Sequence, residues 1–422
     1  MTHFGIISLA ATGHLNTMLP LGHELQKRGH CVTVFSNPSV EAKAHLAGFN
    51  FRAIGNIEMS AEKEAEHYAQ QGKLSGLAAL RHTLDGLKHR AYISLRDTPK
   101  AIKEAGVEAL LVDMSAFEGG TIAEFLNLPF ITVCSALPFY QEEFVPPIST
   151  TWTYKHSCLA RFRNRIAHNL FNLFGQPIRD VVSEYRKQWN LPAYSSDRDF
   201  FSKLAIISQH PQEFEFPRHE LPSHFYFTGP FHDSTGREDI DFPFDKLNGK
   251  PLIYASMGTL QNRLEYIFHV IASACAELDA QLVISLGGSL EPERLSNLPG
   301  EPLVVKYAPQ LELIKKASLV ITHAGMNTTL ESLSNGVPMV GIPVTADQPG
   351  VAARIAWSGV GEFVPLSRLS AIKLKETVKQ VWKEESYRKN AVRLQNAISS
   401  AGGVRRAADI IEISTKSNFK RD

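Results

Sequence analysis

Short apolar runs alternate with amphipathic stretches at the beginning of the chain. Residues 4–9 form an apolar run, and a glycine-containing loop at residues 10–14 interrupts it. Residues 15–27 then carry apolar side chains at helical spacing, with Gly29 just past the end, and residues 31–35 form a second apolar run. This order predicts a strand, a tight loop, a helix and a second strand.

The same alternation continues through most of the chain. Further strands are predicted at residues 109–112, 130–134, 204–207, 252–255, 282–285, 303–305, 319–321 and 339–342. Helices fit between them, for example at residues 121–126, and a helical stretch runs from Leu374 to about Ile413. Strands that alternate with helices imply parallel sheets covered by helices on both faces. We therefore expect an α/β protein with two doubly wound, Rossmann-like domains that face each other across a cleft.

The alternation lapses at residues 232–250, which begin with a polar stretch, and we interpret this segment as a linker. We thus predict an N-terminal domain at residues 1–231 and a C-terminal domain at residues 251–390. Residues 391–422 are expected to form a C-terminal helix and a polar tail that return toward the N-terminal domain. Because ligands bind beyond the carboxyl ends of parallel strands, the loops that follow the strands are where we look for chemistry.

Composition narrows the class of protein. The net charge is +1, so no strong overall field favours nucleic acid. The four cysteines form no CxxC pair, which argues against a zinc site or a disulfide framework: Cys31, Cys134, Cys158 and Cys275. No basic residue precedes Lys27, and no apolar run approaches the ~18 residues of a membrane-spanning helix. We expect a cytoplasmic protein, for which any membrane contact is peripheral.

One segment departs from this even charge distribution. Residues 144–179 contain no Asp or Glu but five basic side chains: Lys155, Arg161, Arg163, Arg165 and Arg179. Apolar residues lie among them, including Trp152, Tyr154, Phe162, Leu170, Phe171, Leu173 and Phe174. A basic and aromatic segment can lie on an anionic membrane surface. The alternative is a helix that packs its aromatic side chains inward and turns its arginines toward water.

A polar loop at residues 322–331 directly follows the strand predicted at residues 319–321. It carries His323, Asn327 and Thr328 at the start of a helix, where free backbone N–H groups favour anions. The loop is therefore suited to a diphosphate held without a lysine. Glu331 lies about two turns further along the helix, where a carboxylate can accept hydrogen bonds from ribose hydroxyls. The alternative is a capped helix in a structural turn.

Three other loops in this half offer complementary groups. Residues 255–259 combine a glycine with hydroxyl side chains. Residues 307–310, Tyr-Ala-Pro-Gln, can place an aromatic face beside a planar base. In residues 343–350, Asp347 and Gln348 place acceptors and donors side by side, as hydroxyl-rich sugars require.

In this order, the four segments resemble the donor-binding signature of family 1 UDP-glycosyltransferases, which have the two-domain GT-B fold. The resemblance implies that the C-terminal domain binds a UDP-sugar and the N-terminal domain an acceptor. The residues it implicates are, for the diphosphate, Gly258, Thr259, His323, Gly325, Asn327 and Thr328; for the base, Tyr307 and Ala308; for ribose, Gln310 and Glu331; and for the hexose, Asp347 and Gln348. Plant members usually have tryptophan at the positions of Tyr307 and Met326.

The N-terminal half carries a second motif of the same family. The sequence GHLNTMLPL, which begins at Gly13, resembles the family motif, with Thr17 in place of the usual proline. An acceptor hydroxyl must lose its proton as it attacks, and histidine titrates near neutrality. The resemblance implies that His14 is this base and that Asp113 orients it. Taken singly, His14 can be a structural histidine and Asp113 a helix cap.

The reaction that the resemblance implies is a single displacement with inversion, in which a hexose, expected to be glucose, moves from a UDP-sugar to a hydroxyl. We expect no metal and no other cofactor; Asp239-Ile240-Asp241 resembles the metal motif of a different transferase fold but lies in the predicted linker. Residues 343–355 are similar to bacterial zeaxanthin glucosyltransferases. The expected acceptor is a lipophilic small molecule: a carotenoid such as zeaxanthin, a flavonoid or another phenol.

Other functions share this fold. A sugar-nucleotide epimerase or a lipid-linked sugar transferase is expected to lack the combination of the His14–Asp113 pair with Asp347–Gln348. A non-catalytic UDP-sugar-binding partner protein is expected to have lost the base or the donor motif, and this chain has both. A dehydrogenase is disfavoured because no GxGxxG follows a predicted strand.

Overall fold

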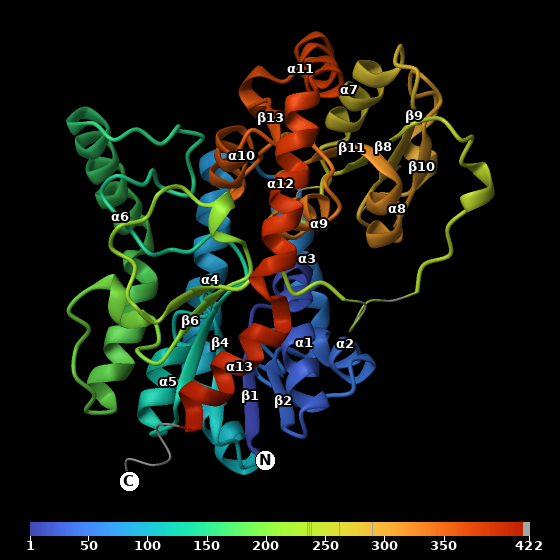
Figure 1. Cartoon of the computed structure of the whole chain (residues 1–422). Helices are drawn as coiled ribbons and strands as arrows, with labels where there is room; N and C mark the ends of the chain where they lie inside the picture. Colours follow the sequence, from blue (N-terminus) through green and yellow to red (C-terminus); the bar gives the residue numbers. More distant parts are fainter. Residues whose placement is uncertain (234, 236, 238, 261, 289, 417–422) are drawn as a thin grey trace.

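The structure is a computed structural model that describes residues 1–416, except residues 234, 236, 238, 261 and 289. The first half forms a seven-stranded parallel sheet in the order β3-β2-β1-β4-β5-β6-β7 (Figure 1). Its strands are β1 (His3–Ile7), β2 (Cys31–Ser36), β3 (Asn50–Ala53), β4 (Ala109–Asp113), β5 (Phe130–Cys134), β6 (Ile206–Ser208) and β7 (Phe225–Phe227). Its helices are α1 (Thr12–Lys27), α2 (Glu41–Leu46), α3 (Ala61–Gln71), α4 (Gly76–Ala105), α5 (Gly119–Phe125) and α6 (Cys158–Gln188).

The second half forms a six-stranded parallel sheet in the order β10-β9-β8-β11-β12-β13. Its strands are β8 (Leu252–Ser256), β9 (Gln281–Ser285), β10 (Leu303–Val305), β11 (Ala317–Thr322), β12 (Met339–Gly341) and β13 (Gly361–Phe363). The helices are α7 (Glu265–Cys275), α8 (Gln310–Lys316), α9 (Met326–Ser334), α10 (Gln348–Trp357), α11 (Ala371–Lys383), α12 (Glu385–Ala401) and α13 (Gly403–Lys416). The predicted fold class, two parallel-sheet α/β domains, is confirmed.

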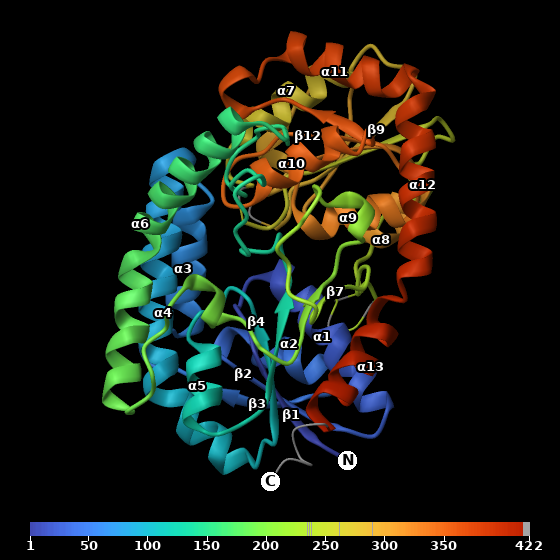
Figure 2. The same cartoon turned by 60° about the vertical axis from the view of Figure 1, so that its left-hand side comes forward.

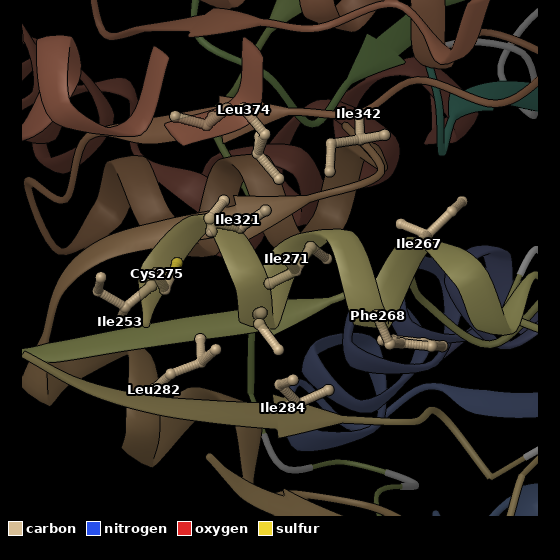
Figure 3. Packing of buried hydrophobic residues seen from close by; sticks show 14 of the residues in the cluster. Ile253, Ile267, Phe268, Ile271, Cys275, Leu282, Ile284, Ile321, Ile342 and Leu374 are labelled. Atoms are coloured by element: carbon tan, nitrogen blue, oxygen red, sulfur yellow. The ribbon is translucent and has the colours of Figure 1, made fainter. Parts of the chain in front are cut away.

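Each sheet is held by an apolar core between its strands and the helices that cover it. In the second half, α7 turns Ile267, Phe268 and Ile271 toward the sheet, where they meet side chains from β8, β9 and β11 (Figure 3). All three are fully buried. Residues at i, i+1 and i+4 lie on one side of a helix, so the apolar spacing of this segment decides which face packs.

The chain ends on the domain where it began. Helix α12 packs against α9, and α13 then packs against α1, so the last two helices span both halves (Figures 1 and 2). Ala407, Ala408 and Ile411 of α13 are buried in the core of the first sheet. The Arg28 guanidinium donates to Asp409 Oδ1 at 2.6 Å. Arg28 and His30, at the end of α1, therefore both hold α13 in place.

The two halves belong to different sheets, but the exact domain limits at residues 231, 250 and 390 remain predictions. The C-terminal helical region does not begin at residue 391; α12 begins at Glu385. The predicted polar tail, residues 417–422, lies outside the described residues. In the part of the chain that the structure describes, no helix combines the length and the apolarity needed to cross a bilayer.

Candidate active site

A cavity of about 1650 Å³ lies between the two halves, at the carboxyl ends of both sets of parallel strands. Twelve residues that the sequence implicates in donor binding line it: Gly258, Thr259, Tyr307, Ala308, Gln310, His323, Gly325, Asn327, Thr328, Glu331, Asp347 and Gln348. His14 lines the same cavity from the opposite side. Asp113 is not part of the cavity wall because it lies fully buried behind His14.

The His14–Asp113 pair combines two neighbouring strand ends. His14 lies in the first turn of α1, just past β1, and Asp113 is the last residue of β4, which pairs with β1. The His14 Nδ1 atom lies 2.7 Å from Asp113 Oδ2. Because Asp113 accepts hydrogen bonds, this contact places the proton on Nδ1 and leaves Nε2 as the basic nitrogen.

Three further donors hold the Asp113 carboxylate. The Ser115 backbone N–H donates to Oδ1 at 2.9 Å, and the Ser8 hydroxyl donates to Oδ2 at 3.2 Å. The Ser135 hydroxyl lies 3.0 Å from Oδ2 and 2.8 Å from His14 Nδ1. Burial opposes the charged carboxylate, but His14 and these hydrogen bonds together lower the pKa of Asp113 below its ordinary value.

The charge on Asp113 also acts on the histidine. Burial of the imidazole lowers the pKa of His14, but the charge and hydrogen bond of Asp113 outweigh burial, so the pKa lies above its ordinary value. The His14 side chain keeps 20% of its surface exposed toward the cavity side. The arrangement therefore provides an oriented imidazole that can take a proton and be stabilised once it is charged.

On the opposite wall, His323 lies between β11 and α9 and packs against two glycines. A side chain on Gly258 or Gly325 would come within 2.5 Å of the imidazole: 2.5 Å at Gly258 and 2.4 Å at Gly325. Ala324, between His323 and Gly325, has a φ of 63°, a strained conformation that often accompanies functional sites. Burial lowers the pKa of His323 to about 4. His323 is therefore neutral at physiological pH and offers a hydrogen bond rather than a positive charge.

A carboxylate–amide cluster lies further along α9 on the same wall of the cavity. Glu331 of α9 is 1% exposed. The Gln310 amide donates to Glu331 Oε2 at 2.5 Å, and the Tyr254 hydroxyl donates to Gln310 Oε1 at 3.1 Å. Arg237, from the segment between the two sheets, donates to Glu331 Oε1 at 2.7 Å. The predicted ribose-binding residues thus lie together, and Arg237 adds a cation beside them.

Asp347 and Gln348 stand at the start of α10. The Leu137 backbone N–H donates to Asp347 Oδ2 at 3.2 Å, which ties this carboxylate to the first half of the chain. Burial raises the pKa of Asp347. Gln348 Oε1 accepts from the backbone N–H groups of Val344 and Thr345, at 2.9 and 3.1 Å, and these bonds shape the loop.

Asn327 connects the two walls of the cavity. Its side-chain amide donates to the Gly13 carbonyl at 2.7 Å, and its Oδ1 accepts from Gln209 Nε2 at 3.1 Å. The Thr17 hydroxyl donates to the same Oδ1 at 3.4 Å. The sequence predicts Asn327 only beside a diphosphate, whereas the structure shows that it also ties α9 to Gly13, the residue before His14.

The remaining residues of the donor set lie around this cluster. Tyr307 is 48% exposed, and its ring packs so closely on Gly288 that a side chain there would come within 2.2 Å. Thr328 Oγ1 accepts from Gln310 Nε2 at 3.3 Å. Within the described residues, no group of three or more His, Cys, Asp or Glu side chains is arranged to hold a metal ion.

Sequence reasoning missed several residues of this site. Ser135 directly follows β5, at the edge where the loops after parallel strands meet, but the resemblance that pointed to Asp113 did not include it. Gln209 follows β6 in the same way. Arg237 gave no such signal, because it belongs to a linker without a regular pattern and meets Glu331 only in the folded chain.

Two doubly wound parallel sheets face a common cavity, with His14 on one side and the twelve predicted donor-binding residues on the other, as in glycosyltransferases of the two-domain type. The model of the family "UDP-glucoronosyl and UDP-glucosyl transferase" matches residues 8–399. The chain belongs to this family. As in other members, its acceptors are small molecules.

Individual relatives agree with this assignment. The chain is 30% identical over 416 residues to a zeaxanthin glucosyltransferase of Pantoea ananas, covering 98% of this chain and 96% of the relative. It is 27% identical to the NDP-glycosyltransferase YjiC of Bacillus licheniformis, covering 97% of both chains. Among solved structures, the calicheamicin glycosyltransferase CalG4 is similar in fold, with a TM-score of 0.75, 21% identity and 99% of each chain covered.

Proposed function

We propose that the protein transfers a hexose from a UDP-sugar to a hydroxyl of a lipophilic small molecule, with inversion at the anomeric carbon. The proposed hexose is glucose. The observation that carries this proposal is the 2.7 Å contact between His14 and Asp113 at the edge of the cavity that the donor residues line. A base and a donor site in one cavity are what direct displacement requires.

In the proposed reaction, the acceptor hydroxyl gives its proton to His14 Nε2 while its oxygen attacks the anomeric carbon. The new C–O bond forms opposite the bond to the UDP phosphate oxygen, which breaks with its electron pair, so the configuration inverts. UDP leaves, and the proton remains on His14. Asp113 stabilises the imidazolium that forms, and Ser135 holds both side chains in position.

The donor residues have matching roles in this proposal. The N–H groups at the start of α9 and the neutral His323 donate to the diphosphate, in a site that we propose needs no metal. The Glu331 carboxylate accepts hydrogen bonds from the ribose hydroxyls, and the Gln310 side-chain amide donates to the ribose. Asp347 and Gln348 take the hexose hydroxyls.

The acceptor is proposed from the relatives. The zeaxanthin glucosyltransferases of Pantoea ananas and Pseudescherichia vulneris are named for a carotenoid, and each covers almost the whole chain. We extend this to a lipophilic acceptor with a free hydroxyl, whether carotenoid, flavonoid or another phenol. The protein is proposed to act in the cytoplasm.

Release of UDP tests the proposal. UDP-glucose is offered with zeaxanthin, flavonols and simple phenols, and UDP is measured with and without each acceptor. Acceptor-dependent release of UDP is expected from the unaltered chain. His14→Ala is expected to lower it by roughly a hundredfold or more while UDP affinity, measured by calorimetry, stays the same. UDP binding without release for any acceptor would favour the non-catalytic binder, and full activity of His14→Ala would remove the histidine from the mechanism.

A further inference from the structure

Helix α6 carries a continuous apolar stripe on its outer face. Six large side chains within its first half are exposed: Leu159, Phe162, Ile166, Leu170, Leu173 and Phe174. Leu159 is 83% exposed and Leu173 is 68% exposed. Their spacing of three and four residues places them along one side of the helix. Exposed apolar groups that gather in this way indicate an interaction surface, whereas single ones need no explanation.

The opposite side of α6 already has its partner. Ala160, Ile178 and Val182 are buried, and the helix packs along α4. In both views α6 lies at the edge of the molecule, with α4 between it and the rest of the first domain (Figures 1 and 2). Of the two interpretations of this segment, inward packing of all its aromatic side chains is therefore wrong, because Phe162 and Phe174 point outward.

Positive charge accompanies the stripe. Residues 144–179 contain five Lys and Arg and no acidic side chain. Arg161 pairs with Glu143, but Lys155 and Arg165 are exposed and form no ion pair with any residue that the structure describes. Arg163 lies over the ring of Trp152, 4.3 Å from its centre. The surface thus combines apolar side chains that can enter a lipid layer with cations that can meet anionic headgroups.

We propose that this face of α6 docks on the surface of an anionic lipid bilayer. An amphipathic helix with an apolar stripe and basic flanks binds at the boundary between headgroups and acyl chains. A second copy of the chain fits less well, because a twofold interface would bring Lys155 and Arg165 of both copies onto one patch. The docking does not depend on the proposed catalytic function. If both hold, the cavity wall formed by α4 lies next to a membrane that can hold lipophilic acceptors.

Vesicle flotation of the full chain, without any substrate, tests the proposal. The chain is mixed with vesicles of phosphatidylcholine alone or with phosphatidylglycerol added. The expected result is binding to the phosphatidylglycerol vesicles that weakens as salt is raised. The variant Leu159→Ser/Phe162→Ser/Leu173→Ser is expected to bind these vesicles at least roughly tenfold more weakly than the unaltered chain. These side chains are exposed, so its thermal midpoint should match the unaltered chain.

A matched control removes three equally exposed apolar side chains from other parts of the surface: Ile57→Ser/Ile372→Ser/Ile413→Ser. This control is expected to float like the unaltered chain. Equal flotation of the α6 variant and the control would overturn the proposal. Equal binding of the unaltered chain to vesicles with and without phosphatidylglycerol would also overturn it. If sedimentation shows that the unaltered chain is a dimer and that the α6 variant is a monomer, the stripe is a self-association surface instead.

Discussion

In the proposed reaction, the imidazole of His14 has to be neutral before it can take a proton from an acceptor, and the charge of Asp113 favours its protonated form instead. Asp113 raises the pKa of His14, so the base form dominates only above a pH higher than the ordinary histidine value. The same charge stabilises the imidazolium that forms during transfer. If His14 is the base, as proposed, it is expected to be active on the alkaline side of its own pKa.

We predict that kcat/KM rises with pH through a pKa above 6.5, the ordinary value for histidine. Asp113→Asn removes the charge that raises this pKa, so the rising limb is expected to move to lower pH. The plateau is expected to fall by roughly a hundredfold because the transferred proton loses its stabilising charge. Rate profiles of both chains from pH 5 to pH 10 provide the measurement, and an unmoved limb would show that another group titrates.

The glycine before Thr259 is required for two reasons. Gly258 has a φ of 73°, and an added Cβ would lie 2.5 Å from the His323 ring. Gly258→Ala is expected to weaken UDP binding by roughly tenfold or more, measured by calorimetry, because the ring must move. Gly29→Ala is the matched control: its φ is 87°, but nothing lies within 4 Å of the added atom. It should cost stability without changing UDP affinity.

At the scale of elements, α10 is fixed to the first domain by a buried ion pair. Arg354 and Glu215 are both almost fully buried, and Arg354 Nε donates to Glu215 Oε1 at 2.8 Å. Burial opposes the charge, yet Arg354 and Arg218 lower the pKa of Glu215 well below its ordinary value. Gly350 approaches Ile148 so closely that its N–H donates to the Ile148 carbonyl at 2.8 Å. Because Asp347 and Gln348 begin this helix, these contacts also position the proposed sugar-binding pair against His14.

Removing Arg354 takes away the nearest cation of the buried Glu215 carboxylate and leaves it with His210 and with Arg218, whose Nη2 lies 3.6 Å away. Arg354→Met alone is expected to cost about 3–5 kcal/mol of stability, visible as a lower thermal midpoint. Glu215→Leu/Arg354→Met removes both charges and should restore part of that loss, because Arg218 still has Glu142 as a partner, 3.7 Å away. If the double variant is no more stable than the single one, the buried charge is not the cause of the instability.

At the scale of the whole molecule, the cavity exists only while both halves stay together. Asn327 bonds across it to Gly13, and α12 and α13 carry the chain back from the second half to the first. The core of the first sheet includes Ile411 of α13, which is fully buried. The last helix is therefore part of the first domain's core as well as a strap between the halves.

A chain that ends at Gly402 lacks α13. The face of α1 that packs against α13 in the full chain is then exposed to solvent. Burial of each large apolar side chain contributes about 1.5–3 kcal/mol, so we expect a clearly lower thermal midpoint or aggregation. A chain that ends at Lys416 keeps α13 and serves as the control, with an unchanged midpoint. Equal midpoints for both truncations would show that α13 adds nothing to the stability of the first domain.

Local sequence patterns predicted most of the strands, the candidate site residues and the family of this protein. The period of apolar positions predicts most of the buried strands, and the ends of these strands and the loops after them hold His14, Asp113 and the donor residues, whose roles are implied by the resemblance to the family. The strands β3, β7 and β13 were not predicted; β3 (NFRA) and β13 (GEF) include polar residues and therefore form no continuous apolar run. The four donor segments also identified the family, because their order and spacing are properties of the sequence itself.

Only the tertiary structure decided which distant side chains meet. Ser135 joins His14 across 121 positions, Arg237 meets Glu331 across 94, and Arg354 meets Glu215 across 139. The pattern of α6 likewise shows an apolar face but not which side packs, because that depends on where α4 lies. Sequence patterns are short-ranged, whereas these contacts depend on how two sheets and a returning helix are placed in space. For this reason the sequence by itself determined the class and the candidate reacting groups, and the fold determined how these groups are held and which surface stays uncovered.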